Sequence, residues 1–208
     1  MQTRLTDLPL RDFADRLASA DPTPGGGSAA AYAGAMGAAL AAMVGRIAMK
    51  RQTTAALTDI VDEADGLRAH FVQLVQDDSA AFDRVMAALS LPKRTAEEKS
   101  TRKEALQGAL LAASRVPLDA AKAGRRLLGL CERLLEHAAS AAVSDAGVAA
   151  LLAETALRGA ALNVMINLAS LADATHVKAL SEELDRAIEG AEALRAAVVE
   201  RVEAKIAR

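Results

Sequence analysis

Asp78 is a carboxylate on a helix face that is otherwise apolar. The residues that share its face at helical spacings are Phe71, Leu74, Val75, Phe82, Val85 and Leu89. A carboxylate in such a place is partly desolvated, which raises its pKa and suits it to general acid or base chemistry. Asp77 points about 100° away around the helix and is expected to meet water. An ion pair or hydrogen bond between helices explains Asp78 equally well at this point.

Asn163 and Asn167 stand one helical turn apart and therefore share a face. Their neighbours on that face are mostly small: Leu152, Ala156, Gly159 and Ser170. Each amide offers both a hydrogen-bond donor and an acceptor, so the pair could line a pocket for a polar ligand. Hydrogen bonds between helices are the alternative interpretation.

A glycine-rich turn, Gly25, Gly26 and Gly27, leads into Ser28 at an expected helix start. The backbone N–H groups of such a turn can hold an anion or a carbonyl oxygen, and Ser28 is expected to cap the helix. The turn matches neither the phosphate-loop pattern nor the dinucleotide fingerprint.

Asp145 also stands at an expected helix start, where helix capping is the usual role of an aspartate. The three histidines, His70, His137 and His176, lie far apart and show no paired spacing, so no metal site is expected. Cys131 lies within an apolar segment and is expected to be a core residue rather than a nucleophile.

Helices must position these residues, because the periodicity is helical throughout and no alternating strand pattern of useful length occurs. The expected helices span residues 5–20, 28–49, 53–91 (with 58 as the other possible start), 95–116, 118–137, 148–171 and 175 to the C-terminus. We therefore expect an all-α fold in which residues 1–208 form a single domain. It is a helical bundle of about six or seven helices around a central helix rich in alanine and glycine.

Several helix boundaries follow from local signals. Thr95 with Glu98 has the form of a capping box, and Pro117 is expected either to kink a helix or to start the next one. In the Ala-rich helix, Gly37, Ala41 and Gly45 repeat every four residues. One face of that helix thus has almost no side-chain bulk, and another backbone or a ligand can approach it closely.

Composition excludes several functional classes. The net charge is −2, with 25 Lys and Arg against 27 Asp and Glu, which is unlike the strong positive charge of a nucleic-acid-binding protein. The single cysteine cannot form an intrachain disulfide, and the N-terminus lacks the apolar region of a signal peptide. The uncharged run 29–45 has modest hydrophobicity and is typical of a buried bundle helix. A soluble cytoplasmic protein that binds neither nucleic acid nor membrane is expected.

Four segments, in this order, carry a resemblance to a known family: PTPGGGSAAAYAGAMGAALAAMVG from Pro22, DSAAFDRVMAALSLPKRTAEEKSTR from Asp78, VPLDAA from Val116 and VSDAGVAALLAETALRGAALNVMINL from Val143. Together they resemble the cyclodeaminase/cyclohydrolase family. That family includes the C-terminal domain of formiminotransferase-cyclodeaminase and the stand-alone bacterial methenyltetrahydrofolate cyclohydrolases.

The resemblance implies a homodimeric helical bundle that binds a folate between helices and uses no metal or redox cofactor. Carried over by position, the family's motif residues are Gly25, Gly26, Gly27, Ser28, Asp78, Lys93, Asp145, Asn163 and Asn167. Two segments depart from the family pattern. Residues 48–51 replace a Gly-Lys-Lys-like stretch, and residues 137–142 lack a Gly-Asn pair that precedes the Ser-Asp motif in many relatives.

The reaction that the resemblance implies is hydrolysis of 5,10-methenyltetrahydrofolate to 10-formyltetrahydrofolate. Asp78 or Asp145 would deprotonate the water, Asn163 and Asn167 would orient the pterin, and Lys50, Arg51 or Lys93 would meet the glutamate tail. One alternative is a formimidoyltetrahydrofolate cyclodeaminase that releases ammonia, which we consider second because the chain contains no formiminotransferase half. The other is a non-catalytic dimer that binds folate or serves as a scaffold.

Overall fold

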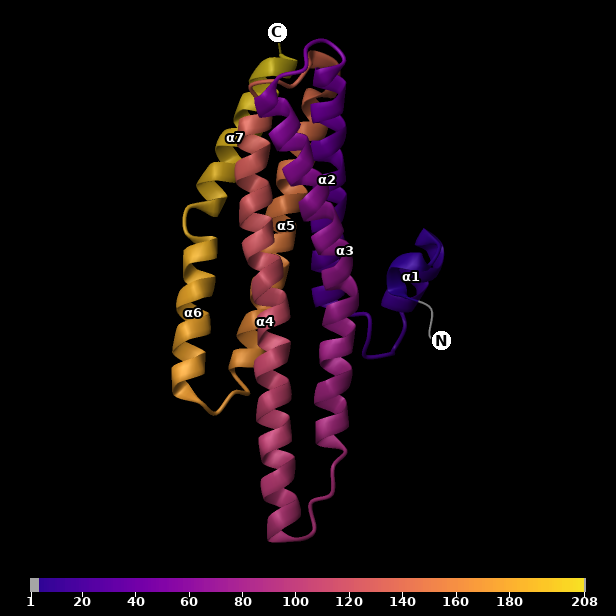
Figure 1. Cartoon of the computed structure of the whole chain (residues 1–208), viewed down its shortest axis with the longest axis vertical. Helices are drawn as coiled ribbons and strands as arrows, with labels where there is room; N and C mark the ends of the chain where they lie inside the picture. The colour runs from indigo at the N-terminus through magenta and orange to yellow at the C-terminus, as the bar shows by residue number, and fades with distance from the viewer. Residues whose placement is uncertain (1–3, 208) are drawn as a thin grey trace.

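The computed structural model describes residues 4–207 and is all-α over that range (Figure 1). Its seven α-helices are α1 (Leu10–Leu17), α2 (Gly26–Met49), α3 (Ala55–Leu89), α4 (Ala96–Leu134), α5 (Val143–Leu168), α6 (Ala174–Ile188) and α7 (Ala191–Ile206). Two short 3-10 turns, η1 (Leu5–Asp7) and η2 (Ser140–Ala142), precede α1 and α5. The predicted all-α bundle of six or seven helices is confirmed.

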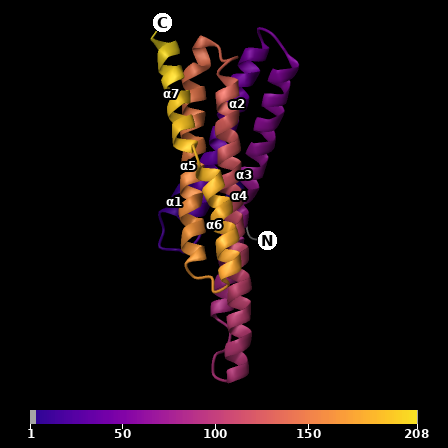
Figure 2. The ribbon, with the colours of Figure 1, turned by 90° about the vertical axis from the view of Figure 1, so that its left-hand side faces the viewer.

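Four helices form the core, and they pack in the cyclic order α2, α3, α4, α5. The shorter α6 and α7 lie against α4 and α5 on one side of this core (Figures 1 and 2). Helix α1 contacts the core through Phe13, whose ring centroid lies 5.3 Å from that of Tyr32 on α2. The hairpin of α3 and α4 extends beyond the other core helices at one end of the molecule. Since helix α4 has 39 residues, it is about 58 Å long.

Small residues let the core helices approach closely. A Cβ on Gly124 would lie 2.9 Å from the backbone nitrogen of Leu157, so α4 and α5 are nearly in backbone contact there. Along α2, a Cβ on Gly37 would lie 3.1 Å from the Ala149 carbonyl oxygen, and one on Gly45 would lie 2.6 Å from the Val61 side chain. The predicted face of low bulk on α2 is therefore where α3 and α5 pack.

Two helical segments, Gly26–Met49 and Ser140–Leu168, are long and apolar enough to cross a membrane by length and composition. Within the most apolar part of Gly26–Met49, 67% of the residues are buried in the bundle. Such burial is expected of a core helix. It agrees with our interpretation of the uncharged run 29–45 as a buried bundle helix.

Near the N-terminus the structure differs from the expected helix over 5–20. The segment is split into η1 and α1 because Leu8, which precedes Pro9, is extended, with φ −74° and ψ 146°. The expected capping role of Ser28 was also wrong. Gly25 is the N-cap of α2, and Ser28 lies in the first turn with its side chain fully buried.

Helix α4 is continuous where two helices were expected. Pro117 lies inside it, and the helix runs on to Leu134. The predicted capping box of Thr95 and Glu98 is confirmed. The last helix, expected from residue 175, begins at Ala174 after its N-cap Asp173, and it is divided at Gly190, whose φ of 67° is in the left-handed region.

Candidate functional site

One cavity of about 330 Å³ brings together six of the residues singled out in the sequence. Gly25, Gly26 and Gly27 come from the start of α2, Asp78 from α3, and Asn163 and Asn167 from the end of α5. The other lining residues are Pro22, Thr23, Ala81, Phe82, Val85, Ala113, Ile166 and Ser170. Its volume falls within the range of small-molecule sites.

Asp78 meets the first turn of α2. The Ser28 hydroxyl donates a 2.9 Å hydrogen bond to Asp78 Oδ2 and also lies 3.2 Å from the Val75 carbonyl oxygen. Desolvation by burial raises the pKa of Asp78 above its usual value of 3.8, whereas the hydroxyl and backbone of Ser28 oppose that rise. Asp78 is thus a carboxylate with a raised pKa that is held on a buried donor and faces a cavity.

The absence of a side chain at Gly27 leaves room for the Asp78 carboxylate. A Cβ on Gly27 would lie 2.1 Å from Asp78 Oδ1 and 2.6 Å from its Cγ, so no larger residue fits while the carboxylate stays there. The first N–H groups of a helix have no partner within it. The glycines therefore also present backbone N–H groups near the cavity, as the sequence indicated.

The two asparagines are held by their amide nitrogens. Asn163 Nδ2 donates a 2.9 Å hydrogen bond to the Gly159 carbonyl oxygen. Asn167 Nδ2 donates a 2.9 Å hydrogen bond to the Ala113 carbonyl oxygen of α4. Both partners are carbonyl oxygens, which only accept hydrogen bonds. In each side-chain amide the nitrogen, and not the oxygen, must therefore face the partner. Neither Oδ1 has a hydrogen-bond partner within residues 4–207, so both carbonyl oxygens can accept from a ligand.

Pro117 explains why the Ala113 carbonyl is available to Asn167. A proline has no N–H, so Pro117 cannot bond to the carbonyl four residues before it, which is that of Ala113. The freed carbonyl accepts from Asn167 instead. Sequence reasoning missed Ala113 as a site residue, although a proline at 117 in a helical segment was the signal for a free carbonyl at 113.

Apolar side chains complete one part of the cavity. Phe82, Val85 and Ile166 line it; Ile166 is largely exposed and Phe82 is 36% exposed. The sequence placed Phe82 and Val85 on the apolar face that carries Asp78 but did not identify them as site residues. They line the site because α3 continues past the start of α2 (Figure 1) and faces the end of α5 across the cavity.

Three predicted site residues lie away from this cavity within the chain. Lys50 follows the far end of α2, about 36 Å along the helix from Gly26. Lys93 is exposed in the connection between α3 and α4. Asp145 lies in the first turn of α5, about 27 Å along that helix from Asn163, and does not cap it.

Other reactive side chains are engaged elsewhere. Cys131 is buried in the core, and desolvation raises its pKa to about 12. His70 pairs with Asp119 and His176 with Asp173, both at partly exposed positions.

Within the described residues, the Asp78 cavity is thus the place where a perturbed carboxylate, free amide oxygens and an apolar wall converge. A carboxylate so placed can stabilise a bound cation and accept a proton from water.

Comparisons with known proteins agree on one family. Residues 9–186 match formiminotransferase-cyclodeaminase. The chain is 40% identical to a methenyltetrahydrofolate cyclohydrolase of Methylorubrum extorquens over 95% of this chain and 97% of that protein. It is 35% identical to a formimidoyltransferase-cyclodeaminase of Sus scrofa, with 97% of this chain and 38% of that longer protein aligned. The crystal structure of a formiminotetrahydrofolate cyclodeaminase from Thermotoga maritima has a TM-score of 0.78 and 31% identity, covering 97% of this chain and 96% of that one. The chain therefore belongs to the formiminotransferase-cyclodeaminase family.

Proposed function

We propose that this protein is a methenyltetrahydrofolate cyclohydrolase whose active site is the Asp78 cavity. The observation that carries the proposal is the 40% identity to a cyclohydrolase along nearly the full length of both chains. A carboxylate, two amide oxygens and an apolar wall around one cavity suit the cationic, flat ring system of the substrate. The test is whether the purified protein accelerates the loss of methenyltetrahydrofolate absorbance above the spontaneous rate.

In this reaction the bridge carbon between N5 and N10 is electrophilic because it shares the positive charge of the methenyl group. The Asp78 carboxylate takes a proton from a water molecule as the water oxygen bonds to that carbon. The resulting tetrahedral intermediate collapses by breaking its bond to N5, which takes up a proton. The formyl group stays on N10, and one proton is released overall.

The other residues of the cavity have supporting roles. The free Oδ1 atoms of Asn163 and Asn167 accept hydrogen bonds from the pterin N–H groups or from the attacking water. Phe82, Val85 and Ile166 cover the ring faces and exclude bulk water, which strengthens the attraction of Asp78 for the cation. Lys93 remains our candidate for contact with the glutamate tail, whereas Lys50 lies about 36 Å along α2 from Gly26 and is too far from the cavity within one chain.

A cyclodeaminase is the second candidate, favoured by the likeness to the Thermotoga maritima structure. There N10 attacks a formimino carbon carried by N5, and ammonia leaves after protonation. The same cavity could hold that intermediate. We rank the cyclohydrolase first because that relative is 40% identical to this chain, whereas the pig enzyme is 35% identical and the Thermotoga maritima cyclodeaminase 31% identical.

Ser28→Ala should shift the pH dependence of kcat/KM. Ser28 favours the ionised form of Asp78, so its loss raises the pKa of that carboxyl further. Because the ionised form is the base, the acid limb of the profile moves to higher pH, and the high-pH plateau changes less. Ser114→Ala is the control, since that buried hydroxyl bonds only within its own helix. An unmoved acid limb would remove Ser28 from this role.

We further propose that the active protein is a homodimer that pairs through the exposed faces of α2 and α5. Large apolar side chains follow one stripe on each of these neighbouring helices: Met36, Met43, Val148, Leu151, Leu162, Met165 and Ile166. Contiguous exposed apolar surface of this kind is typical of protein interfaces. A two-fold axis near residue 157, the midpoint of the stripe on α5, would pair the two copies of that helix antiparallel.

This arrangement would bring Asp145 of a second copy close to the Asp78 cavity. Across an axis near residue 157, position 145 of one copy lies opposite position 169 of the other, next to Asn167 and Ser170. The motif residue that lies outside the cavity within one chain would then complete the site of its neighbour.

We place this enzyme in the cytoplasm, where its folate substrate would be available.

Leu162→Glu should convert the dimer to a monomer and abolish most activity, because it buries a charge in the apolar interface. Leu10→Glu is the matched control, since Leu10 is exposed to a similar degree but lies on α1. Light scattering gives the mass.

In addition, mixed Asp78→Asn and Asp145→Asn chains should regain about a quarter of wild-type activity through one intact site per mixed dimer. A monomeric wild type, or no recovery on mixing, would contradict the shared site.

A further inference from the structure

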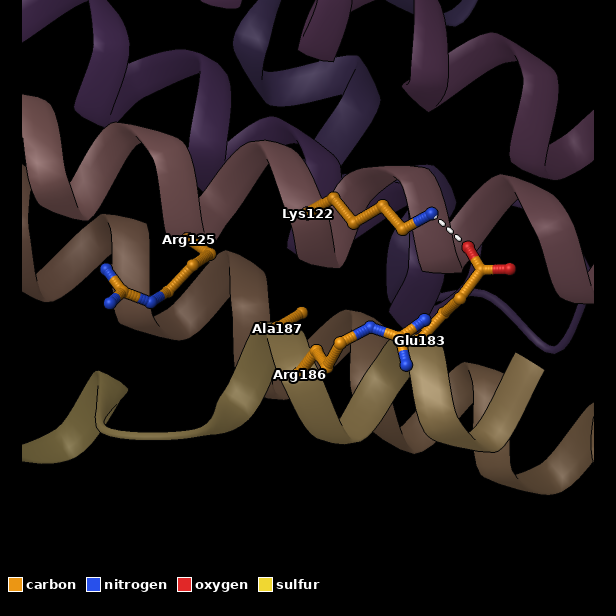
Figure 3. A pocket seen from close by; sticks show the side chains of 5 residues that line it. All are labelled: Lys122, Arg125, Glu183, Arg186 and Ala187. Carbon is orange, nitrogen blue, oxygen red and sulfur yellow. Dashed lines mark hydrogen bonds and ion pairs between the residues drawn. The ribbon is translucent and has the colours of Figure 1, made fainter. Parts of the chain in front are cut away.

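A groove between α4 and α6 is lined mainly by positive charge. It has a volume of about 320 Å³ and is formed by Lys122 and Arg125 on α4 and by Glu183, Arg186 and Ala187 on α6 (Figure 3). It shares no residue with the Asp78 cavity. Ala113 of that cavity and Lys122 are nine residues, about 14 Å, apart along α4.

The groove has more cations than its own acid can neutralise. Glu183 forms an ion pair with Lys122, which Figure 3 shows as a dashed line. Arg125 and Arg186 have no carboxylate partner within residues 4–207; they line the groove from opposite helices, and Figure 3 shows their side chains extending to opposite sides of Ala187. Two arginines in excess of the internal ion pair therefore line the groove.

The positive charge continues along the same seam. A neighbouring hollow of about 410 Å³ shares Lys122 and Glu183 and adds Arg115, which also lacks a carboxylate partner among the described residues. Its other acid, Asp119, is paired with His70. The pKa of Glu183 is lowered mainly by its hydrogen bond with Lys122, and the charges of Arg186 and Arg115 lower it further. Three cations, Lys122, Arg186 and Arg115, thus surround the Glu183 carboxylate.

We propose that this groove binds a small multivalent oxyanion, of which pyrophosphate is the simplest probe. Guanidinium groups bind phosphate and carboxylate oxygens in forked pairs, so Arg125 and Arg186 can hold the two ends of such an anion once their side chains turn toward each other over Ala187. Lys122 and Glu183 are partly exposed, with side chains 45% and 35% accessible, so their ion pair opens at little cost. Lys122 can then turn to the ligand.

The proposal is tested by calorimetric titration of the full chain with pyrophosphate at low ionic strength, with citrate and sulfate as comparison anions. We expect one pyrophosphate per chain, and affinity at least about tenfold weaker in the R125A/R186A double variant. Glu183→Gln should bind more tightly than wild type, because the competing carboxylate is gone. Stronger binding of citrate than pyrophosphate would identify a polycarboxylate as the physiological class.

A charge-matched control separates a site from general attraction. R102A/K178A removes two cations from the same two helices outside the groove and should leave pyrophosphate affinity unchanged. Equal weakening in both double variants, no binding by the wild type, or no effect of R125A/R186A would overturn the proposal. Methenyltetrahydrofolate hydrolysis by R125A/R186A should stay at the wild-type rate, so this test is independent of the proposed function.

Discussion

Asp78→Asn should lower kcat/KM for methenyltetrahydrofolate hydrolysis by about 10²–10⁴-fold, the usual contribution of a positioned general base. Asparagine has the same shape and can still accept from the Ser28 hydroxyl, but it cannot take a proton from water or attract the methenyl cation as a full charge does. The loss should be largest above the raised pKa of Asp78, where the wild-type carboxylate is ionised.

The same substitution should leave the fold at least as stable as wild type at neutral pH. Burial raises the folded-state pKa of Asp78 above 3.8, so the contribution of this group to stability is full below pH 3.8 and is lost as pH rises through the raised value. The neutral asparagine has no such dependence. Denaturant unfolding at several pH values would reveal a wild-type decline that Asp78→Asn lacks, which separates loss of catalysis from loss of structure.

Asp77→Asn is the matched control, because it removes the same charge one residue away. Asp77 accepts a 2.8 Å hydrogen bond from Gln73 and does not line the cavity. Its turnover should stay within about twofold of wild type, as expected for a group outside the site. If the two variants lost activity equally, the effect would come from net charge on α3 rather than from a base in the cavity.

Gly27→Ala should lower kcat/KM by about 10²-fold, the size of effect expected when a reacting group is displaced by roughly 1 Å. The added Cβ would lie 2.1 Å from Asp78 Oδ1, so the carboxylate must move or α2 and α3 must separate. Overpacking of this kind also costs about 1–3 kcal/mol of stability. Stopped-flow absorbance and urea unfolding would measure the two effects.

Gly66→Ala makes the same chemical change where there is space. Apart from its chain neighbours and the backbone of its own helix, no atom lies within 4 Å of the Cβ position at Gly66, which is inside α3. This variant should gain about 0.5–1 kcal/mol, because alanine favours a helix more than glycine does, and should keep its activity. Wild-type turnover in Gly27→Ala would mean that the position of Asp78 does not matter to the reaction.

Much of the site followed from helical periodicity. The spacing of Asp78 among apolar residues predicted its partial burial, and the one-turn spacing of Asn163 and Asn167 predicted a shared face. The Gly25–Gly27 turn was expected to present backbone N–H groups. All these residues line one cavity, because each signal concerns which face of a single helix a residue occupies.

The contacts between helices were beyond the sequence pattern. The partner of Ser28 depends on how α2 and α3 are aligned, and its burial beside Asp78 overrode the capping role that its position suggested. Likewise, the use of the Ala113 carbonyl by Asn167 requires α4 to continue through Pro117, where local propensity predicted a break. The distance between Asp145 and the cavity follows from the length of α5 and was open until that helix was placed.

The central claim is that the Asp78 cavity hydrolyses the methenyl bridge, and its most direct test is the absorbance decay of methenyltetrahydrofolate with purified wild type and Asp78→Asn. We predict a wild-type rate well above spontaneous hydrolysis, formation of 10-formyltetrahydrofolate and a near-spontaneous rate for the variant. A wild-type rate equal to the spontaneous one, together with ammonia release from formiminotetrahydrofolate, would contradict the cyclohydrolase and identify a cyclodeaminase. Equal acceleration by both proteins would place the chemistry outside this cavity.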